Sequence, residues 1–177
     1  MKDRMLLVIR GFAGVGKSTL AREFSKKHDF ALLKQDAFVF DMNQASMIKR
    51  EARAMDCKVG FSNIITVMKN YMDIGKSIVL EGALVPLTAG DPFDLDKVFA
   101  LAKGHGYTVK LITLETQDKV RKKRQKKRGY VLPVKIDCEL AARTGRQELL
   151  APNLVIDTSK INVRQSLIEI ESAVMQL

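Results

Sequence analysis

The chain contains little of several residue types that mark special protein classes. Its 177 residues include no tryptophan, two cysteines, four prolines and 6% aromatic residues. Cys57 and Cys138 lie far apart and form no CxxC pair, so we expect neither a disulfide framework nor a zinc site. Because 46% of the residues are hydrophobic, a disordered tail is excluded. The low glycine and proline content excludes a fibrous or linker-like chain.

Long apolar runs are also missing. No segment approaches the roughly 18 uninterrupted apolar residues that cross a membrane. The run of five apolar residues before Arg10 is too short for a secretory signal. We therefore expect a cytoplasmic protein with no membrane partner. Its length predicts a single domain over residues 1–177.

Positive charge is concentrated in one place. The net charge is +10, and residues 119–128 (K-V-R-K-K-R-Q-K-K-R) supply eight basic side chains in ten residues, so the remainder of the chain is nearly neutral. A run of this kind binds nucleic acid, binds a small anion or is simply solvated.

Short apolar runs rich in β-branched residues alternate with helical patterns. We expect strands near residues 6–9, 31–33, 77–82, 108–114 and 153–157. We expect helices over residues 18–28, from Asn43 to before Gly60, and over 62–75, 94–103, 119–128, 133–149 and 162–174. In the last helix, Asn162 and Gln165 are spaced as a capping box. The alternation predicts an α/β fold, a three-layer α/β/α sandwich with a parallel sheet of about five strands.

One motif carries specific chemistry. Residues 11–18 read G-F-A-G-V-G-K-S, which matches G-x-x-x-x-G-K-[ST] between an apolar strand and an amphipathic helix. Backbone N–H groups can surround phosphate oxygens only where side chains are absent, which explains the glycines. Lys17 would add a charge at the β- and γ-phosphates, and the Ser18 hydroxyl would ligate Mg²⁺. The expected nucleotide contacts are Gly11, Ala13, Gly14, Val15, Gly16, Lys17, Ser18 and Thr19.

With this motif the sequence resembles the P-loop NTPases, and within them the small kinases of the nucleoside-monophosphate-kinase-like group, including AAA-type and zeta-toxin-like kinases. The resemblance implies a P-loop NTPase fold, an acceptor-binding helical segment at about 37–75 and an arginine-bearing lid at about 117–132. It also implies that ATP is the phosphoryl donor, that Mg²⁺ is the metal and that a small-molecule hydroxyl is the acceptor.

Two acidic residues follow expected strands. Ligands of an open parallel sheet bind beyond the carboxyl ends of its strands, so Asp36 is placed to accept a proton from an attacking hydroxyl or to hold Mg²⁺. Asp36 is alternatively a turn residue. Glu81 resembles the third-strand acid that organises Mg²⁺ in related kinases, although many of them have aspartate there. Its alternative role is an ordinary ion pair with a lysine.

Arg121, Arg124 and Arg128 are spaced i, i+3 and i+7 on the expected helix. Arginines at fixed spacing can stabilise the charge that phosphoryl transfer spreads over oxygens, so all three are catalytic candidates. By resemblance, Arg121 matches the lid arginine that stacks on adenine, and Thr158 and Ser159 match the loop at the edge of the adenine. The alternative for the arginines is a solvated basic face.

Three functions remain open from the residues. The leading one is a kinase for a small hydroxyl acceptor. The basic run favours a 5′-hydroxyl polynucleotide kinase instead, but the few aromatics and the absence of an arginine just after Asp36 disfavour it. The third is a regulatory nucleotide-binding ATPase. No motif identifies the acceptor or the oligomeric state.

Overall fold

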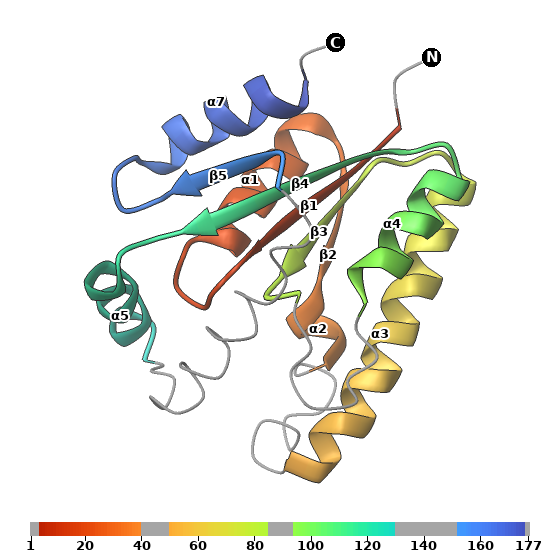
Figure 1. The fold of residues 1–177 in the computed structure, drawn as a ribbon, viewed down its shortest axis with the longest axis horizontal. Helices are drawn as coiled ribbons and strands as arrows, with labels where there is room; N and C mark the ends of the chain where they lie inside the picture. The colour runs from red at the N-terminus through yellow and green to blue at the C-terminus, as the bar shows by residue number, and fades with distance from the viewer. Residues whose placement is uncertain (1–3, 40–49, 85–93, 130–151, 176–177) are drawn as a thin grey trace.

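Five strands form one parallel sheet in a computed structural model that describes residues 4–39, 50–84, 94–129 and 152–175. In chain order they are β1 (Met5–Gly11), β2 (Ala31–Lys34), β3 (Ile78–Gly82), β4 (Thr108–Glu115) and β5 (Leu154–Asp157). Their order across the sheet is β2-β3-β1-β4-β5, so the first strand lies in the centre (Figure 1).

Helices cover both faces of this sheet (Figure 1). The described helices are α1 (Lys17–His28), α2 (Gln35–Val39), α3 (Arg50–Asp73), α4 (Leu95–Gly104), α5 (Asp118–Lys127) and α7 (Val163–Val174). Parallel strands are joined by crossover connections of one hand, and because the chain moves from β1 first to one side of the sheet and later to the other, its helices lie on both faces. The predicted three-layer α/β/α architecture is confirmed. In the part of the chain that the structure describes, no helix is long and apolar enough to cross a membrane.

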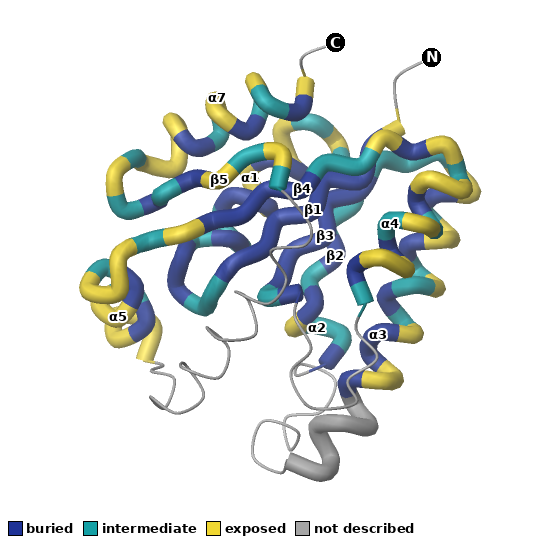
Figure 2. The backbone as a smooth tube through the Cα atoms, viewed as in Figure 1, coloured by how far each residue is buried: buried dark blue, intermediate teal, exposed yellow. Residues whose placement is uncertain are grey.

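The alternation of side chains along β1 divides the core into two layers. Leu6 and Val8 pack with residues of α3 and α4, whereas Leu7 and Ile9 pack with residues of α1 and α7. All four side chains are fully buried, and Figure 2 shows the central strands as the most buried part of the molecule. Each such side chain stabilises the fold by about 1.5–3 kcal/mol relative to an exposed one.

The C-terminal helix begins as its sequence predicts. The Asn162 side chain accepts a hydrogen bond from Gln165 N (3.0 Å), and Gln165 Oε1 accepts one from Asn162 N (3.1 Å). This capping box starts α7 directly after the β5 connection. It therefore helps to place residues 158–162 at the carboxyl edge of the sheet.

Gly60 does not end a helix, contrary to the prediction, because α3 continues through it. A Cβ atom at Gly60 would lie 2.7 Å from both the Phe38 carbonyl oxygen and Val39 Cγ2, so the glycine allows α2 to lie directly against α3. The short helix α2 was not predicted at all. The expected cap at Asn43 and the expected helix at 133–149 lie outside the described residues.

Candidate nucleotide-binding site

The loop between β1 and α1 has backbone angles that favour glycine. Gly11, Gly14 and Gly16 have φ values of 148°, 92° and 105°. A Cβ atom at Gly11 would overlap the Leu114 carbonyl oxygen, and one at Gly14 would lie 3.1 Å from Arg121 Cγ, whereas one at Gly16 would meet nothing within 4 Å. The loop is therefore packed tightly at its first two glycines and open at the third, where α1 begins.

Four consecutive carbonyl groups of this loop accept hydrogen bonds from side chains. Lys17 Nζ donates to Phe12 O (3.0 Å), and Gln125 Nε2 donates to Ala13 O (2.9 Å). Arg124 Nη1 donates to Gly14 O (3.4 Å), and Thr158 Oγ1 donates to Val15 O (2.8 Å). In a trans peptide, the N–H group points opposite to the C=O group. The N–H groups of Gly14 and Gly16, which follow the Ala13 and Val15 carbonyls, therefore point away from Gln125 and Thr158, as an anion cradle requires. The Val15 N–H instead donates to Phe12 O (3.4 Å) within the loop.

Lys17 is buried at the start of α1 beside two acidic groups. Burial lowers the pKa of Lys17, the negative charges of Glu81 and Asp36 oppose that shift, and the positive charge of Arg128 adds to it. The ammonium group of Lys17 therefore donates a hydrogen bond to the Phe12 carbonyl, and the negative charge of Glu81 on β3 compensates its positive charge. The phosphate-binding role of Lys17 stays a prediction.

Glu81 lies at the end of β3 with 4% of its surface exposed. Burial raises the pKa of Glu81, whereas the charge of Lys17 and a hydrogen bond with the Ser18 hydroxyl lower it. Asp36 is exposed in α2 and acts electrostatically on both Lys17 and Glu81. The structure therefore brings Ser18, Asp36, Glu81 and Lys17 together at the carboxyl edge of the sheet.

These oxygen donors suit Mg²⁺ held jointly with a nucleotide. Among the described residues, no group of three or more His, Cys, Asp or Glu residues could hold a metal ion. Mg²⁺ is usually bound by one or two carboxylates together with substrate phosphates and water, not by an all-protein cage. The pairing of Ser18 with Glu81, next to Asp36, fits that pattern.

Arg124 connects the P-loop to the connection after β5. Its guanidinium donates to Thr158 Oγ1 (2.9 Å) and to Thr158 O (2.8 Å). Ser159, by contrast, uses its backbone N–H and its hydroxyl to bind Asp157 Oδ1, and these hydrogen bonds lower the pKa of Asp157. Of the two residues predicted in this connection, Thr158 reaches the P-loop and Ser159 turns back to β5.

A cavity of about 560 Å³ opens beside Gly16. Thr19 lines it from α1, Arg124 from α5, Arg128 from the position directly after α5, and Ile161 from the connection after β5. Its size and its position at the N-terminus of α1 suit the nucleoside part of a nucleotide whose phosphates lie in the loop.

The three predicted arginines occupy different places. Arg121 is only 5% exposed, its Nη2 lies 3.0 Å from Asp118 Oδ1, and its guanidinium lies 5.9 Å from the centre of the Phe12 ring. Arg121 is not among the residues that line the cavity, whereas Arg124 is. Which arginine stacks on the base stays a prediction. Arg128 is exposed and close enough to Lys17 to affect its pKa.

Sequence reasoning missed two buried residues near the loop. Gln125, which is 3% exposed, holds Ala13 O from beneath. Its signal was a single uncharged polar residue at i+4 from Arg121 within the basic run. Arg10 is buried at the end of β1. Its signal was a charged residue within an apolar strand, directly before the glycine of the motif.

The family of the chain follows from its match over most of its length. The family model AAA_33, described as an AAA domain, matches residues 6–144. The chain belongs to this AAA domain family. The resemblance to P-loop NTPases of the small-kinase group is thereby confirmed for this AAA domain. No curated protein sequence matches the chain significantly.

Solved structures share the fold of this AAA domain along nearly its whole length. A candidate kinase from Chloroflexus aurantiacus has a TM-score of 0.72 at 18% identity, covering 99% of this chain and 98% of its own. A sugar kinase from a Janibacter species has a TM-score of 0.68 at 20% identity, with coverage of 97% and 95%. The Mycobacterium tuberculosis APS kinase in complex with AMPPNP and APS has a TM-score of 0.63 at 16% identity, with coverage of 98% and 99%. At these identities the likeness establishes the fold alone.

Proposed function

We propose that the chain is an ATP- and Mg²⁺-dependent kinase that transfers the γ-phosphoryl group to a hydroxyl of a small-molecule acceptor. The observation that carries the proposal is that Gln125 and Thr158 hold the Ala13 and Val15 carbonyls of the P-loop, which leaves the N–H groups of Gly14 and Gly16 directed away from those two side chains. Membership of the AAA domain family and a fold shared with sugar and APS kinases support it.

The residues at the carboxyl edge of the sheet have different roles in the proposed reaction. Lys17 places its charge where the β- and γ-phosphates would lie. Ser18 and Glu81 would hold Mg²⁺, which when bound neutralises charge on the phosphate oxygens. Asp36 is exposed on α2 and accepts the proton of the acceptor hydroxyl. Arg124 orients the nucleotide from the cavity wall.

The remaining predicted residues have supporting roles in this proposal. Arg121 and Gly14 are in close contact, so Arg121 keeps the loop in place from behind. Arg128 lines the cavity, where it would contact phosphate oxygens. Thr158 positions Arg124 and the Val15 carbonyl at once. The proposed acceptor segment begins with α2 and continues into α3.

The test is an acceptor screen with labelled ATP, using wild type, Lys17→Ala, Asp36→Asn and the control Lys97→Ala on the distant helix α4. We expect Lys17→Ala to lower turnover by about 100-fold or more, because a charge directed at the transferring group is lost. Asp36→Asn should keep ATP binding and lose acceptor-dependent turnover, whereas Lys97→Ala should behave like wild type. Unchanged ATP binding and turnover in Lys17→Ala would refute the proposal.

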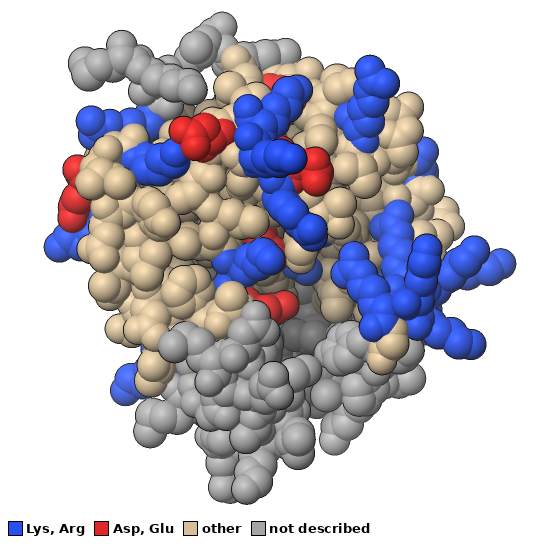
Figure 3. Space-filling view, turned by 180° about the vertical axis from the view of Figure 1, so that it is seen from behind, with Lys and Arg blue, Asp and Glu red and all other residues tan. Residues whose placement is uncertain are grey.

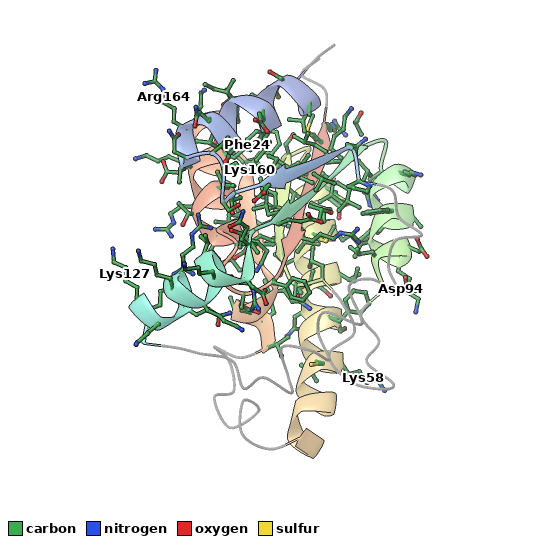
Figure 4. All side chains as sticks on the ribbon, turned by 60° about the vertical axis from the view of Figure 1, so that its left-hand side comes forward. Phe24, Lys58, Asp94, Lys127, Lys160 and Arg164 are labelled. Carbon is green, nitrogen blue, oxygen red and sulfur yellow. The ribbon has the colours of Figure 1, made fainter. Side chains whose placement is uncertain are left out.

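A polynucleotide 5′-hydroxyl is a second candidate acceptor, because α5 presents a basic surface. Its exposed cations, which we call the α5 basic surface, are Lys119, Lys122, Lys123, Lys126, Lys127 and Arg128. Figure 3 shows Lys and Arg gathered at the edge where α5 lies, and Figure 4 shows Lys127 projecting away from the sheet. Oligonucleotide binding through this surface would weaken steeply with salt. Salt-independent binding and no 5′-phosphorylation would exclude this acceptor.

ATP binding without any phosphorylated product would instead indicate a regulatory ATPase.

A further inference from the structure

Arg10 is a charged residue in the central strand of the sheet. It occupies the position just before Gly11, and its surface is 4% exposed. Arg10 Nε donates to Thr113 Oγ1 (2.9 Å) on β4, whereas Nη1 is buried and has no hydrogen-bond partner. A buried N–H donor that lacks a hydrogen-bond partner, such as Nη1 here, destabilises the folded chain.

The charge of Arg10 is also uncompensated among the described residues. Burial lowers the pKa of Arg10, and among the residues that the structure describes no carboxylate opposes that shift. The residues level with Arg10 across the sheet are Gly82 on β3, Thr113 on β4 and Val155 on β5, none of which carries a charge. Buried charges in proteins are normally paired, so Arg10 is suited to bind an anion that none of the described residues supplies.

The place of Arg10 indicates which ligand would supply that anion. Alternation along β1 puts Arg10 on the same face as Leu6 and Val8, which pack with α3 and α4. The helix α1, which carries Lys17, covers the opposite face. Arg10 therefore lies at the ligand-binding edge of the sheet, on the side of α3 and away from the nucleotide cavity.

We propose that Arg10 binds an anionic group of the acceptor, so that the acceptor carries a carboxylate, sulfate or phosphate besides the hydroxyl that is phosphorylated. This inference rests on the proposed kinase function for the identity of the ligand. The guanidinium suits the task because its planar fork can donate two parallel hydrogen bonds to one carboxylate or phosphate. Thr113 fixes one side of that fork through Nε and leaves Nη1 for the ligand.

The first test needs no acceptor. Thermal unfolding is followed against sodium sulfate and sodium acetate at constant ionic strength, for wild type, Arg10→Met and the control Arg4→Met. Arg4 is exposed and directly precedes the same strand at the opposite edge of the sheet. We expect the anions to raise the melting temperature of wild type and Arg4→Met more than that of Arg10→Met. Repeating the titrations in a Lys17→Ala background removes part of the anion binding by the P-loop.

Two results would overturn the proposal. One is an anion response in Arg10→Met equal to that of wild type in the Lys17→Ala background. The other is a melting temperature of Arg10→Met that lies more than about 5 °C below wild type without added anion. That loss would show that the charge of Arg10 is already compensated within the protein.

The second test uses the acceptor screen. With anionic acceptors, Arg10→Met should lower kcat/KM by about 30-fold or more, with an unchanged KM for ATP, because a charged partner would be left unpaired. Neutral acceptors should be phosphorylated poorly by both proteins. A preferred neutral acceptor, or no change with anionic ones, would contradict the proposal. If no acceptor is phosphorylated at all, the kinase function fails, and the anion titrations still decide whether Arg10 binds anions.

Discussion

Replacing Gly60 by alanine tests the close approach of α2 to α3, on which the position of Asp36 depends. Alanine is the residue best suited to a helix, and in an unconstrained helix the change from glycine stabilises by about 1 kcal/mol. At Gly60, however, the new Cβ would lie 2.7 Å from the Phe38 carbonyl oxygen and from Val39 Cγ2. A backbone carbonyl cannot rotate away as a flexible side chain can, so α2 must move.

The gain in helix propensity and the overpacking by the new Cβ change the stability in opposite directions, so their magnitudes decide whether Gly60→Ala stabilises or destabilises the protein. Overpacking of this kind costs about 1–3 kcal/mol. After the gain in helix propensity is subtracted, we expect Gly60→Ala to lower the free energy of unfolding by about 1 kcal/mol, which lowers the melting temperature by about 2–4 °C. Because α2 carries Asp36, acceptor-dependent turnover should fall more than ATP binding.

Gly104, at the end of α4, supplies the matched control. A Cβ atom there would meet nothing within 4 Å, and its φ is not positive. Gly104→Ala should therefore raise the free energy of unfolding by about 0.5 kcal/mol. Urea unfolding followed by far-ultraviolet circular dichroism suits a chain without tryptophan. If both substitutions stabilise the protein equally, the close packing of α2 on α3 is refuted.

Two further substitutions test contacts elsewhere. Thr158→Val should cost about 1–3 kcal/mol of stability and weaken nucleotide binding, because Arg124 loses an acceptor; equal nucleotide affinity in Thr158→Val and Thr158→Ser would contradict this role of the hydroxyl. Hydrogen bonds from Lys27, and to a smaller extent from His28, lower the pKa of Glu171. The ionised Glu171 therefore stabilises the fold above the unfolded pKa of about 4.3, and this stabilisation is lost as the pH falls through the lowered pKa of the folded state. Glu171→Gln should therefore lower the free energy of unfolding by up to about 1 kcal/mol at neutral pH and by little near pH 3, as urea titrations at both pH values would show.

The fold was predictable from the sequence wherever the local sequence pattern and the tertiary packing favour the same element. The strand that ends at Gly11 is an apolar run followed by a glycine motif, and the helix after Asn162 carries its own capping box. The prediction that a helix ends before Gly60 was wrong because a glycine in a helical pattern has two possible causes, which look identical in sequence. It either ends the helix or allows a close neighbour, and only the tertiary contact with Phe38 distinguishes them.

The candidate site was predictable where a motif specifies backbone geometry. The positive φ angles at Gly14 and Gly16 follow from the P-loop pattern. The roles of the arginines were not predictable, because helical spacing shows which residues are near each other and not what each one touches. The guanidinium of Arg121 lies 5.9 Å from the centre of the Phe12 ring, while Arg124 reaches Thr158, which is distant in sequence.

The positive charge of the chain therefore has two parts that respond differently to salt. The α5 basic surface is exposed, so its attraction for a polyanion is screened within about 10 Å at 0.1 M salt. Arg10 is buried, and an anion bound to it would be screened much less. If acceptor selectivity persists as salt is raised, it depends on Arg10. If it disappears together with oligonucleotide binding, it depends on α5.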